Sequence, residues 1–297
     1  MRGGGGLLSP LYCEVAHGSL TGLNLLMSLV WLRVAVLLYT VAALAVLPAA
    51  LYDRPRWRHV AIPAALLGVL FHFVSLAETL SAVYRTISGA FLPARHETQS
   101  LLAMLLAAAF LVIYRMYRTL APGVFLLPIA VLLTIEPAFR PGTETVPLAN
   151  SGWILLHILL LLAAYAALLV SLLTSVLYLI QERRLKAKLP AVRGLPPLET
   201  TEQIALKALL FGLPCMTAGL LIGSALAELT VGPRFFLDPK VLLSFAMWIA
   251  YMGMIFIRRH SGLRGRRAVY LSGFVFLVVL AVWSANQLSA VHRFTAP

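Results

Sequence analysis

The chain contains eight uncharged apolar stretches that are long enough to cross the roughly 30 Å hydrocarbon core of a bilayer as helices. They are Val34–Tyr52, Val60–Ala77, Thr98–Tyr114, Thr119–Ile135, Thr145–Gln181, Ala208–Ala227, Val241–Ile257 and Ala268–Val291. Hydrophobic residues make up 61% of the chain and charged residues only 12%, whereas soluble domains carry about 25% charged residues. A transmembrane barrel would need alternating segments of about ten residues, and the sequence shows none. The sequence therefore predicts an all-α, polytopic membrane helix bundle of about eight transmembrane helices.

Lysine and arginine are distributed unevenly between the loops, and this distribution predicts the orientation of the helices. The loops after the first, third, fifth and seventh stretches hold 15 of the 24 basic residues, and the loops on the opposite face hold seven. Because cytoplasmic loops carry the basic excess, both termini are expected outside. The formal net charge of +13 is thus a topology signal, and no nucleic-acid partner is expected.

Residues 1–32 precede the first predicted span and allow several interpretations. They open with MRGGGG and contain no clear small-residue cleavage site, so no cleavable signal peptide is evident. The segment is an interfacial helix, part of a long first span, or a misassigned start. We therefore divide the chain into an N-terminal segment, residues 1–32, and a transmembrane domain, residues 33–297.

The predicted topology places two histidines near the outer membrane surface. His157, in the fifth span, lies about one and a half turns below the outer surface, and His292 ends the eighth span. The outer loop between the sixth and seventh spans, ELTVGPRFFLDPK, adds Arg234, Asp238 and Lys240. Histidine is a common axial ligand of haem, and basic side chains pair with carboxylates, so these residues could hold a planar anion such as haem. Two histidines on one side can also arise by chance, and the residues alone leave this open.

A third histidine, His72, lies near the centre of the second span, with Ser75 and Thr79 on the same helix face. An imidazole within a bilayer needs a polar partner, so His72 is either functional or a packing histidine with satisfied hydrogen bonds. In the sixth span, Gly219 and Gly223 form a GxxxG spacing, which permits close contact with another helix.

Five stretches, in this order, resemble the cytochrome c assembly protein family, the membrane haem handlers of CcsA and CcmC type. They are WILLHILLLLAAYAALLVSLLTSVLYLIQERRLK, LPPLETTE with the Gly- and Thr-rich helix after it, LDPKVLLSFAMWIAYMGMIFIRR, SGLRGRRAVYLSGF and the final VHRF. The chain looks closest to the HemX-like and YpjD-like branch, whose tryptophan-rich motif is degenerate. The resemblance covers about residues 60–295.

The resemblance also implies a set of site residues. In that family, two external histidines flank a tryptophan-rich segment and ligate haem on the outer face. His157 and His292 match this pair, so the implied metal is haem iron and the implied cofactor is haem b. His72 matches an intramembrane histidine of the larger members. The family's Trp-Asp-Pro-Lys pattern is replaced by Leu237–Lys240, and the aromatic platform is reduced to two phenylalanines.

The function that the resemblance implies is haem handling in cytochrome c assembly, by a multi-pass protein of a bacterial-type inner (plasma) membrane. The implied partners are haem, the lipid bilayer and another cytochrome-assembly or regulated membrane protein. We expect haem delivery or an accessory role rather than enzymatic activity. Two alternatives stay open: a non-haem accessory or regulatory membrane protein of the same fold, and a small-molecule or ion transporter.

Overall fold

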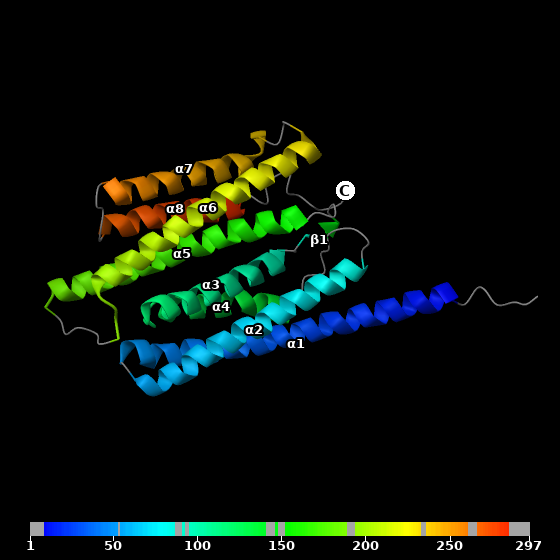
Figure 1. Ribbon diagram of the computed structural model, residues 1–297, viewed down its shortest axis with the longest axis horizontal. Helices are drawn as coiled ribbons and strands as arrows, with labels where there is room; N and C mark the ends of the chain where they lie inside the picture. The colour runs from blue at the N-terminus through cyan, green and yellow to red at the C-terminus, as the bar shows by residue number, and fades with distance from the viewer. Residues whose placement is uncertain are drawn as a thin grey trace, which may run out of the picture.

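The structure is a computed structural model, and it describes residues 9–52, 54–86, 91–92, 95–140, 146–147, 152–188, 194–232, 236–260 and 266–284. Long helices dominate this part of the chain and lie side by side in one bundle (Figure 1). They are α1 (Ser9–Leu51), α2 (Pro55–Thr86), α3 (Arg95–Tyr117), α4 (Gly123–Phe139), α5 (Gly152–Lys186), α6 (Leu198–Val231), α7 (Pro239–His260) and α8 (Arg266–Ser284). A two-residue strand, β1 (Phe91–Leu92), pairs antiparallel with β2 (Val146–Pro147).

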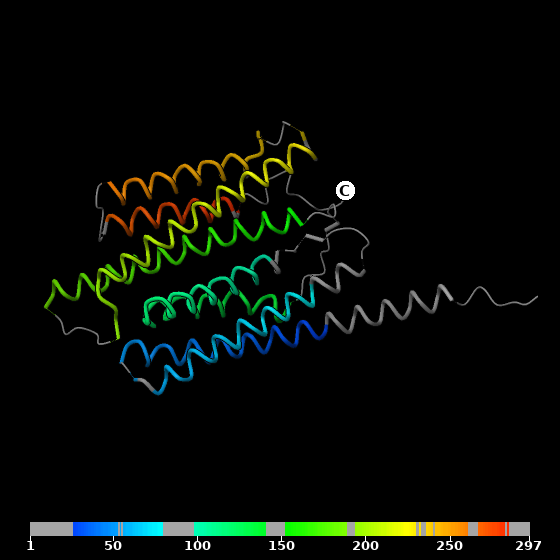
Figure 2. The backbone as a smooth tube through the Cα atoms, viewed as in Figure 1, coloured from blue at the N-terminus to red at the C-terminus, as the bar shows by residue number. Residues whose placement is uncertain are grey.

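Each of the eight predicted spans overlaps one of these helices. In the described part of the chain, six helices have the length and apolar character needed to cross a membrane, and α4 and α8 are shorter apolar helices. The path of the chain shows α4 and α8 running along the same direction as the longer helices (Figure 2). The prediction of an all-α polytopic membrane bundle is therefore confirmed.

Several helix boundaries differ from the predicted ones. Helix α1 runs without interruption from Ser9 to Leu51, so residues 9–32 continue the helix of the first span. Helix α6 begins at Leu198, ten residues before the predicted span, because a helix continues through polar turns that hydropathy excludes. Arg33 and Lys207, which immediately precede the first and sixth predicted spans, consequently lie inside α1 and α6. The division of domains at residue 32 stays a prediction.

The chain reverses direction between successive helices, which gathers the basic loops at one end of the bundle. The α1–α2, α3–α4, α5–α6 and α7–α8 connections all lie toward the left of Figure 1. Arg115, Arg183 and Arg259 lie in the last turns of α3, α5 and α7 at this end. We call it the basic end and the opposite one the outer end, because the positive-inside rule places the basic end in the cytoplasm.

This orientation predicts the result of a topology experiment. Reporter fusions after residues 193 and 264 should give cytoplasmic signals, and a fusion after residue 294 should give an external one. The physical reason is that basic loops are retained on the cytoplasmic side. A cytoplasmic signal from the fusion after residue 294 would contradict the orientation and with it the outer position of His157.

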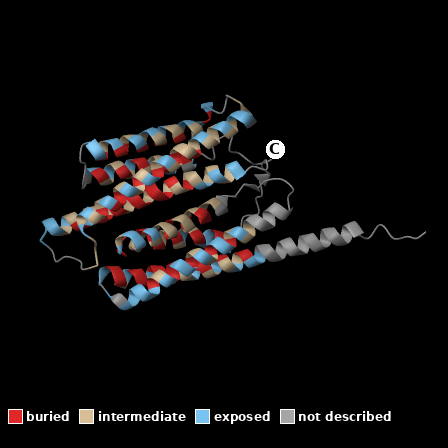
Figure 3. Cartoon of the chain, in the orientation of Figure 1, coloured by how far each residue is buried: buried red, intermediate tan, exposed pale blue. Residues whose placement is uncertain are grey.

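Two apolar clusters hold the bundle together. The first lies mainly between α1, α2, α3 and α4, includes Tyr39, Phe110 and many alanines, and extends to α5 and α6. The second joins α5 to α8 and includes Tyr251 and Met254. Alanine lets neighbouring helices approach closely. Large apolar side chains such as Phe274 are exposed on the bundle surface, and Figure 3 shows such exposed positions along most helices. An apolar exterior of this kind is suited to lipid rather than to water.

Candidate functional site

His157 lies in the second turn of α5, at the outer end, where this helix packs against α6. Its Nδ1 is 2.6 Å from the carbonyl oxygen of Gly219. A carbonyl oxygen only accepts hydrogen bonds, so the geometry places a ring hydrogen on Nδ1; in the neutral imidazole the lone pair is then on Nε2. The side chain is half-buried. A metal-binding histidine commonly donates its second ring nitrogen to a backbone carbonyl in this way.

The close contact between α5 and α6 depends on glycine at position 223. A Cβ atom added to Gly223 would overlap the imidazole of His157, whereas one added to Gly219 would lie 2.9 Å from Cδ2 of Leu161. Close helix contact through this GxxxG spacing is therefore found, and its partner is α5. The same spacing places the His157 ring directly on the α6 backbone.

The two glycines should consequently respond differently to substitution. Gly223→Ala forces the imidazole to move and should destabilise the protein by about 1–3 kcal/mol, the usual cost of overpacking. Gly219→Ala is the matched control and should cost less, because the end of the Leu161 side chain can shift. The measurement is the temperature at which half of the folded protein is lost in detergent, followed by size-exclusion chromatography. A larger loss for Gly219→Ala would contradict this account.

Asp238 lies at the outer end, immediately before α7. Its carboxyl-bearing side chain is buried, with 6% exposed. Its backbone carbonyl accepts a hydrogen bond from the Leu242 N–H at 3.0 Å, and Pro239 occupies the first position of the helix. Aspartate followed by proline is a common helix start. The Asp-Pro pair therefore has a structural role at the start of α7 that does not depend on any ligand.

The other predicted site residues of this region are only partly described. Lys240 lies in the first turn of α7, and its side chain is beyond what the structure describes. Arg234 and His292 lie outside the described residues. The structure thus brings His157 and Asp238 to the same end of the bundle, and the placing of Arg234, Lys240 and His292 around them stays a prediction.

His72 is buried in the contact between α1, α2 and α3. Its Nδ1 is 3.3 Å from the Tyr39 hydroxyl, and its Nε2 is 2.7 Å from the Ser100 hydroxyl. Ser75, which the sequence places on the same helix face, instead donates to the Ser28 carbonyl at 2.7 Å. Both ring nitrogens of His72 thus have hydroxyl partners, as expected of a satisfied packing histidine. Its assignment to a haem site stays a prediction.

Arg258 has a buried role that the sequence does not reveal. It belongs to the basic run that marks the α7–α8 loop, yet only 6% of it is exposed. Its Nη1 donates to the Ser171 hydroxyl at 3.4 Å and its Nη2 to the Ser175 hydroxyl at 2.7 Å, both on α5. The carboxylate of Glu202 on α6 adds a favourable charge. Two serines one turn apart on an apolar helix are the only sequence signal of this contact.

Arg33 also reaches between helices. Its Nε donates to the Ala138 carbonyl at 3.2 Å, and its guanidinium lies 5.6 Å from the centre of the Phe139 ring. These residues form the C-terminal end of α4, where carbonyl groups lack helical partners and the helix dipole favours a cation. Arg33 therefore fastens the end of α4 to α1.

The amino-acid sequence of this chain is similar to those of known proteins. A family model described as cytochrome C assembly protein matches residues 63–289, well over half of the chain. The chain belongs to the cytochrome c assembly protein family. The cytochrome c biogenesis protein CcsA of Guillardia theta is 24% identical over 220 residues, which cover 66% of this chain and 73% of the relative. CcsA of Prochlorococcus marinus strain MIT 9301 is 26% identical over 239 residues, covering 71% and 77%.

A solved structure has a similar fold. The cytochrome c heme lyase CcmF superposes with a TM-score of 0.67 at 16% identity, covering 88% of this chain and 48% of its own. The family predicted from the sequence is thus confirmed, while the HemX-like and YpjD-like branch stays a prediction. The matched range includes His72, His157 and Asp238, and His292 follows three residues after its end.

Proposed function

We propose that this membrane protein handles haem during the assembly of c-type cytochromes, at the outer face of a bacterial-type plasma membrane. Its family membership supports this, because the relatives are named as cytochrome c biogenesis proteins. The fold shared with a heme lyase is consistent with it. The orientation expected from the basic end puts the first turns of α5, with His157, on the outer side.

The proposed ligands of a b-type haem are His157 and His292. The observation that carries His157 is the contact of its Nδ1 with the Gly219 carbonyl at 2.6 Å. With the hydrogen on Nδ1, the neutral imidazole carries its lone pair on Nε2, the form in which imidazole binds iron. Iron held by two imidazoles would supply one-electron chemistry. The basic side chains of Arg234 and Lys240 would pair with the haem propionates.

The remaining residues position this site. The Gly219 carbonyl holds the His157 ring in one orientation through the hydrogen bond it accepts. Gly223 lets the α6 backbone approach the same ring. Asp238 accepts a backbone hydrogen bond at the start of α7, whose first turn carries Lys240. Because the tryptophans of the family motif are absent, we expect weaker haem binding than in the complete members.

The test is an absorbance spectrum of the full-length protein. The protein is expressed with added haem and purified in mild detergent and in lipid nanodiscs, since weakly held haem can dissociate in detergent. We expect a Soret band in nanodiscs at least. A colourless protein in both preparations that co-purifies with another membrane protein would replace this proposal with the accessory or regulatory function.

A further inference from the structure

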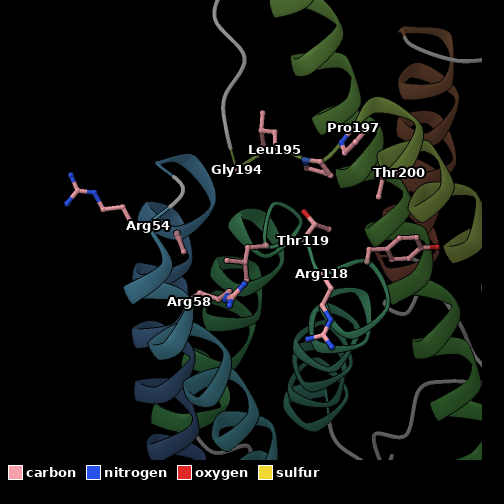
Figure 4. A pocket seen from close by; sticks show the side chains of 12 residues that line it. Arg54, Arg58, Arg118, Thr119, Gly194, Leu195, Pro197 and Thr200 are labelled. Atoms are coloured by element: carbon pink, nitrogen blue, oxygen red, sulfur yellow. The ribbon is translucent and has the colours of Figure 1, made fainter.

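A cavity of about 330 Å³ opens at the basic end, away from His157. Its wall comes from the end of α1, the first turn of α2, the turn between α3 and α4, and the segment that leads into α6 (Figure 4). Four parts of the chain that are distant in sequence therefore meet around one space. His157 lies near the start of α5, at the opposite end of the bundle, so this cavity is separate from the proposed haem site.

The cavity lining is strongly basic. Arg54 and Arg58 contribute from the start of α2, Arg118 from the α3–α4 turn, and Thr119 and Thr200 add hydroxyl groups. Among the described residues that line the cavity, none is acidic. Figure 4 shows Arg58 directed from α2 toward the α3–α4 turn, while Arg54 extends outward from the rim. A cavity whose described lining includes three arginines and no acidic residue favours an anion.

Arg118 is held in place by an unusual backbone conformation. Its φ angle is 54°, in the left-handed region that residues other than glycine seldom adopt. Its N–H donates to the Tyr114 carbonyl at 2.8 Å, and its guanidinium lies 6.0 Å from the Tyr114 ring centre. Such conformations at a non-glycine residue cluster at ligand sites. This backbone conformation follows the end of α3 and places the exposed Arg118 at the cavity wall.

The segment leading into α6 is fixed as well. A Cβ atom on Gly194 would overlap the carbonyl oxygen of Ala50, so this segment packs directly on the end of α1. The Gln181 amide donates to the Pro196 carbonyl at 3.1 Å, and the Thr201 hydroxyl donates to the Gln181 side-chain oxygen at 3.5 Å. These contacts make the cavity a preformed space, which is typical of ligand sites.

The start of α6 adds to the positive potential. The helix begins at Leu198, and Pro197 before it provides no side-chain cap, so its first N–H groups face this region without a capping side chain. Helix N-termini favour anions. Glu199 in the same turn is exposed and does not line the cavity. The dipole therefore acts in the same direction as the arginines.

We propose that this cavity binds a phosphate group at the cytoplasmic face, carried either by an anionic lipid of that leaflet or by a soluble phosphate compound. Arginine forms paired hydrogen bonds with phosphate oxygens. The cavity lies at the helix ends, at the level expected for lipid headgroups, and basic pockets between membrane helices on this side are suited to them. Binding would fasten the α1–α2 pair to the α5–α6 pair.

The experiment compares two double variants of the full-length protein. Arg58→Gln with Arg118→Gln removes cavity charge, and Arg183→Gln with Arg259→Gln removes equal charge from exposed positions at the same end. Binding is measured by native mass spectrometry, with phosphatidylglycerol and phosphatidylcholine as lipid probes and inorganic phosphate as the soluble probe. Phosphatidylglycerol should bind the wild type more tightly than phosphatidylcholine. The cavity variant should bind it about 30-fold more weakly.

The outcomes separate the two sources of phosphate. Loss of phosphatidylglycerol binding in the cavity variant alone supports a lipid ligand, and cavity-dependent binding of inorganic phosphate alone supports a soluble one. Equal losses in both double variants would overturn the proposal. So would a wild-type protein that binds phosphatidylglycerol no more tightly than phosphatidylcholine and does not bind inorganic phosphate. Should the cavity double variant fail to fold, Arg58→Gln is compared with Arg259→Gln, with an expected loss of about fivefold.

Discussion

The variant His157→Ala should lose at least about nine-tenths of the haem that the wild-type protein retains. Removing even an outer partner of a metal-bound histidine lowers metal affinity about 10- to 100-fold, so removing the ligand itself should cost no less. The variant His292→Ala should show a loss of similar size, because the two residues are proposed to bind the same iron. Haem content is measured as Soret absorbance per protein after expression with added haem.

The matched control is His260→Ala, which removes an exposed histidine from the end of α7 at the basic end. It should keep the wild-type haem content. Size-exclusion chromatography of each variant separates loss of haem from loss of fold. A His157→Ala protein that folds and keeps the wild-type spectrum would show that the ligand assignment is wrong.

The pair Ser171→Ala and Ser175→Ala should destabilise the protein by about 2–3 kcal/mol, more than removal of Arg258 itself. The two serine hydroxyls accept hydrogen bonds from the buried Arg258 guanidinium, and a buried cation without acceptors is costly. Arg258→Met should cost about 1 kcal/mol or less, because methionine fills the space and the serines can donate to carbonyls of their own helix. Thermal loss of folded protein in detergent measures both.

A triple variant provides the control for this comparison. Combining both serine substitutions with Arg258→Met removes the stranded cation, so it should be more stable than the double serine variant. This coupling between neighbouring residues is what a shared hydrogen-bond network produces. If Arg258→Met proves more damaging than the serine pair, then the guanidinium acts mainly through Glu202 rather than through α5.

The helices themselves could be predicted because lipid imposes long apolar stretches on each of them. Their ends could not, since hydropathy reports the membrane and not the hydrogen-bonded turns beyond it. Helix α6 thus begins ten residues before its apolar stretch, at Leu198. The fourth predicted span begins at Thr119, four residues before the first residue of α4, Gly123, because hydropathy does not register that Pro122 precedes the first helical turn. The basic loops predict which end of the bundle faces the cytoplasm, because the Lys and Arg bias between loops sets the orientation.

The candidate site could be predicted only as far as single helices allow. The depth of His157 and the GxxxG spacing on α6 are properties of one helix each, but their meeting depends on how α5 and α6 rotate against each other. The partners of His72 illustrate the same limit. Tyr39 and Ser100 come from α1 and α3, and nothing in the pattern of α2 specifies them. Ser75 was the predicted neighbour because it shares the helix face, yet it bonds to the α1 backbone.

The central claim, that the His157 imidazole binds haem iron, is tested most directly by supplying the imidazole from solution. The variant His157→Gly is purified with added haem, and its absorbance spectrum is recorded before and after addition of free imidazole. We expect the variant to lack the low-spin spectrum of the wild type and to regain it when imidazole enters the space left by the side chain. A variant that shows the wild-type spectrum before imidazole is added would contradict the claim, as would a haem-containing variant that imidazole leaves unchanged.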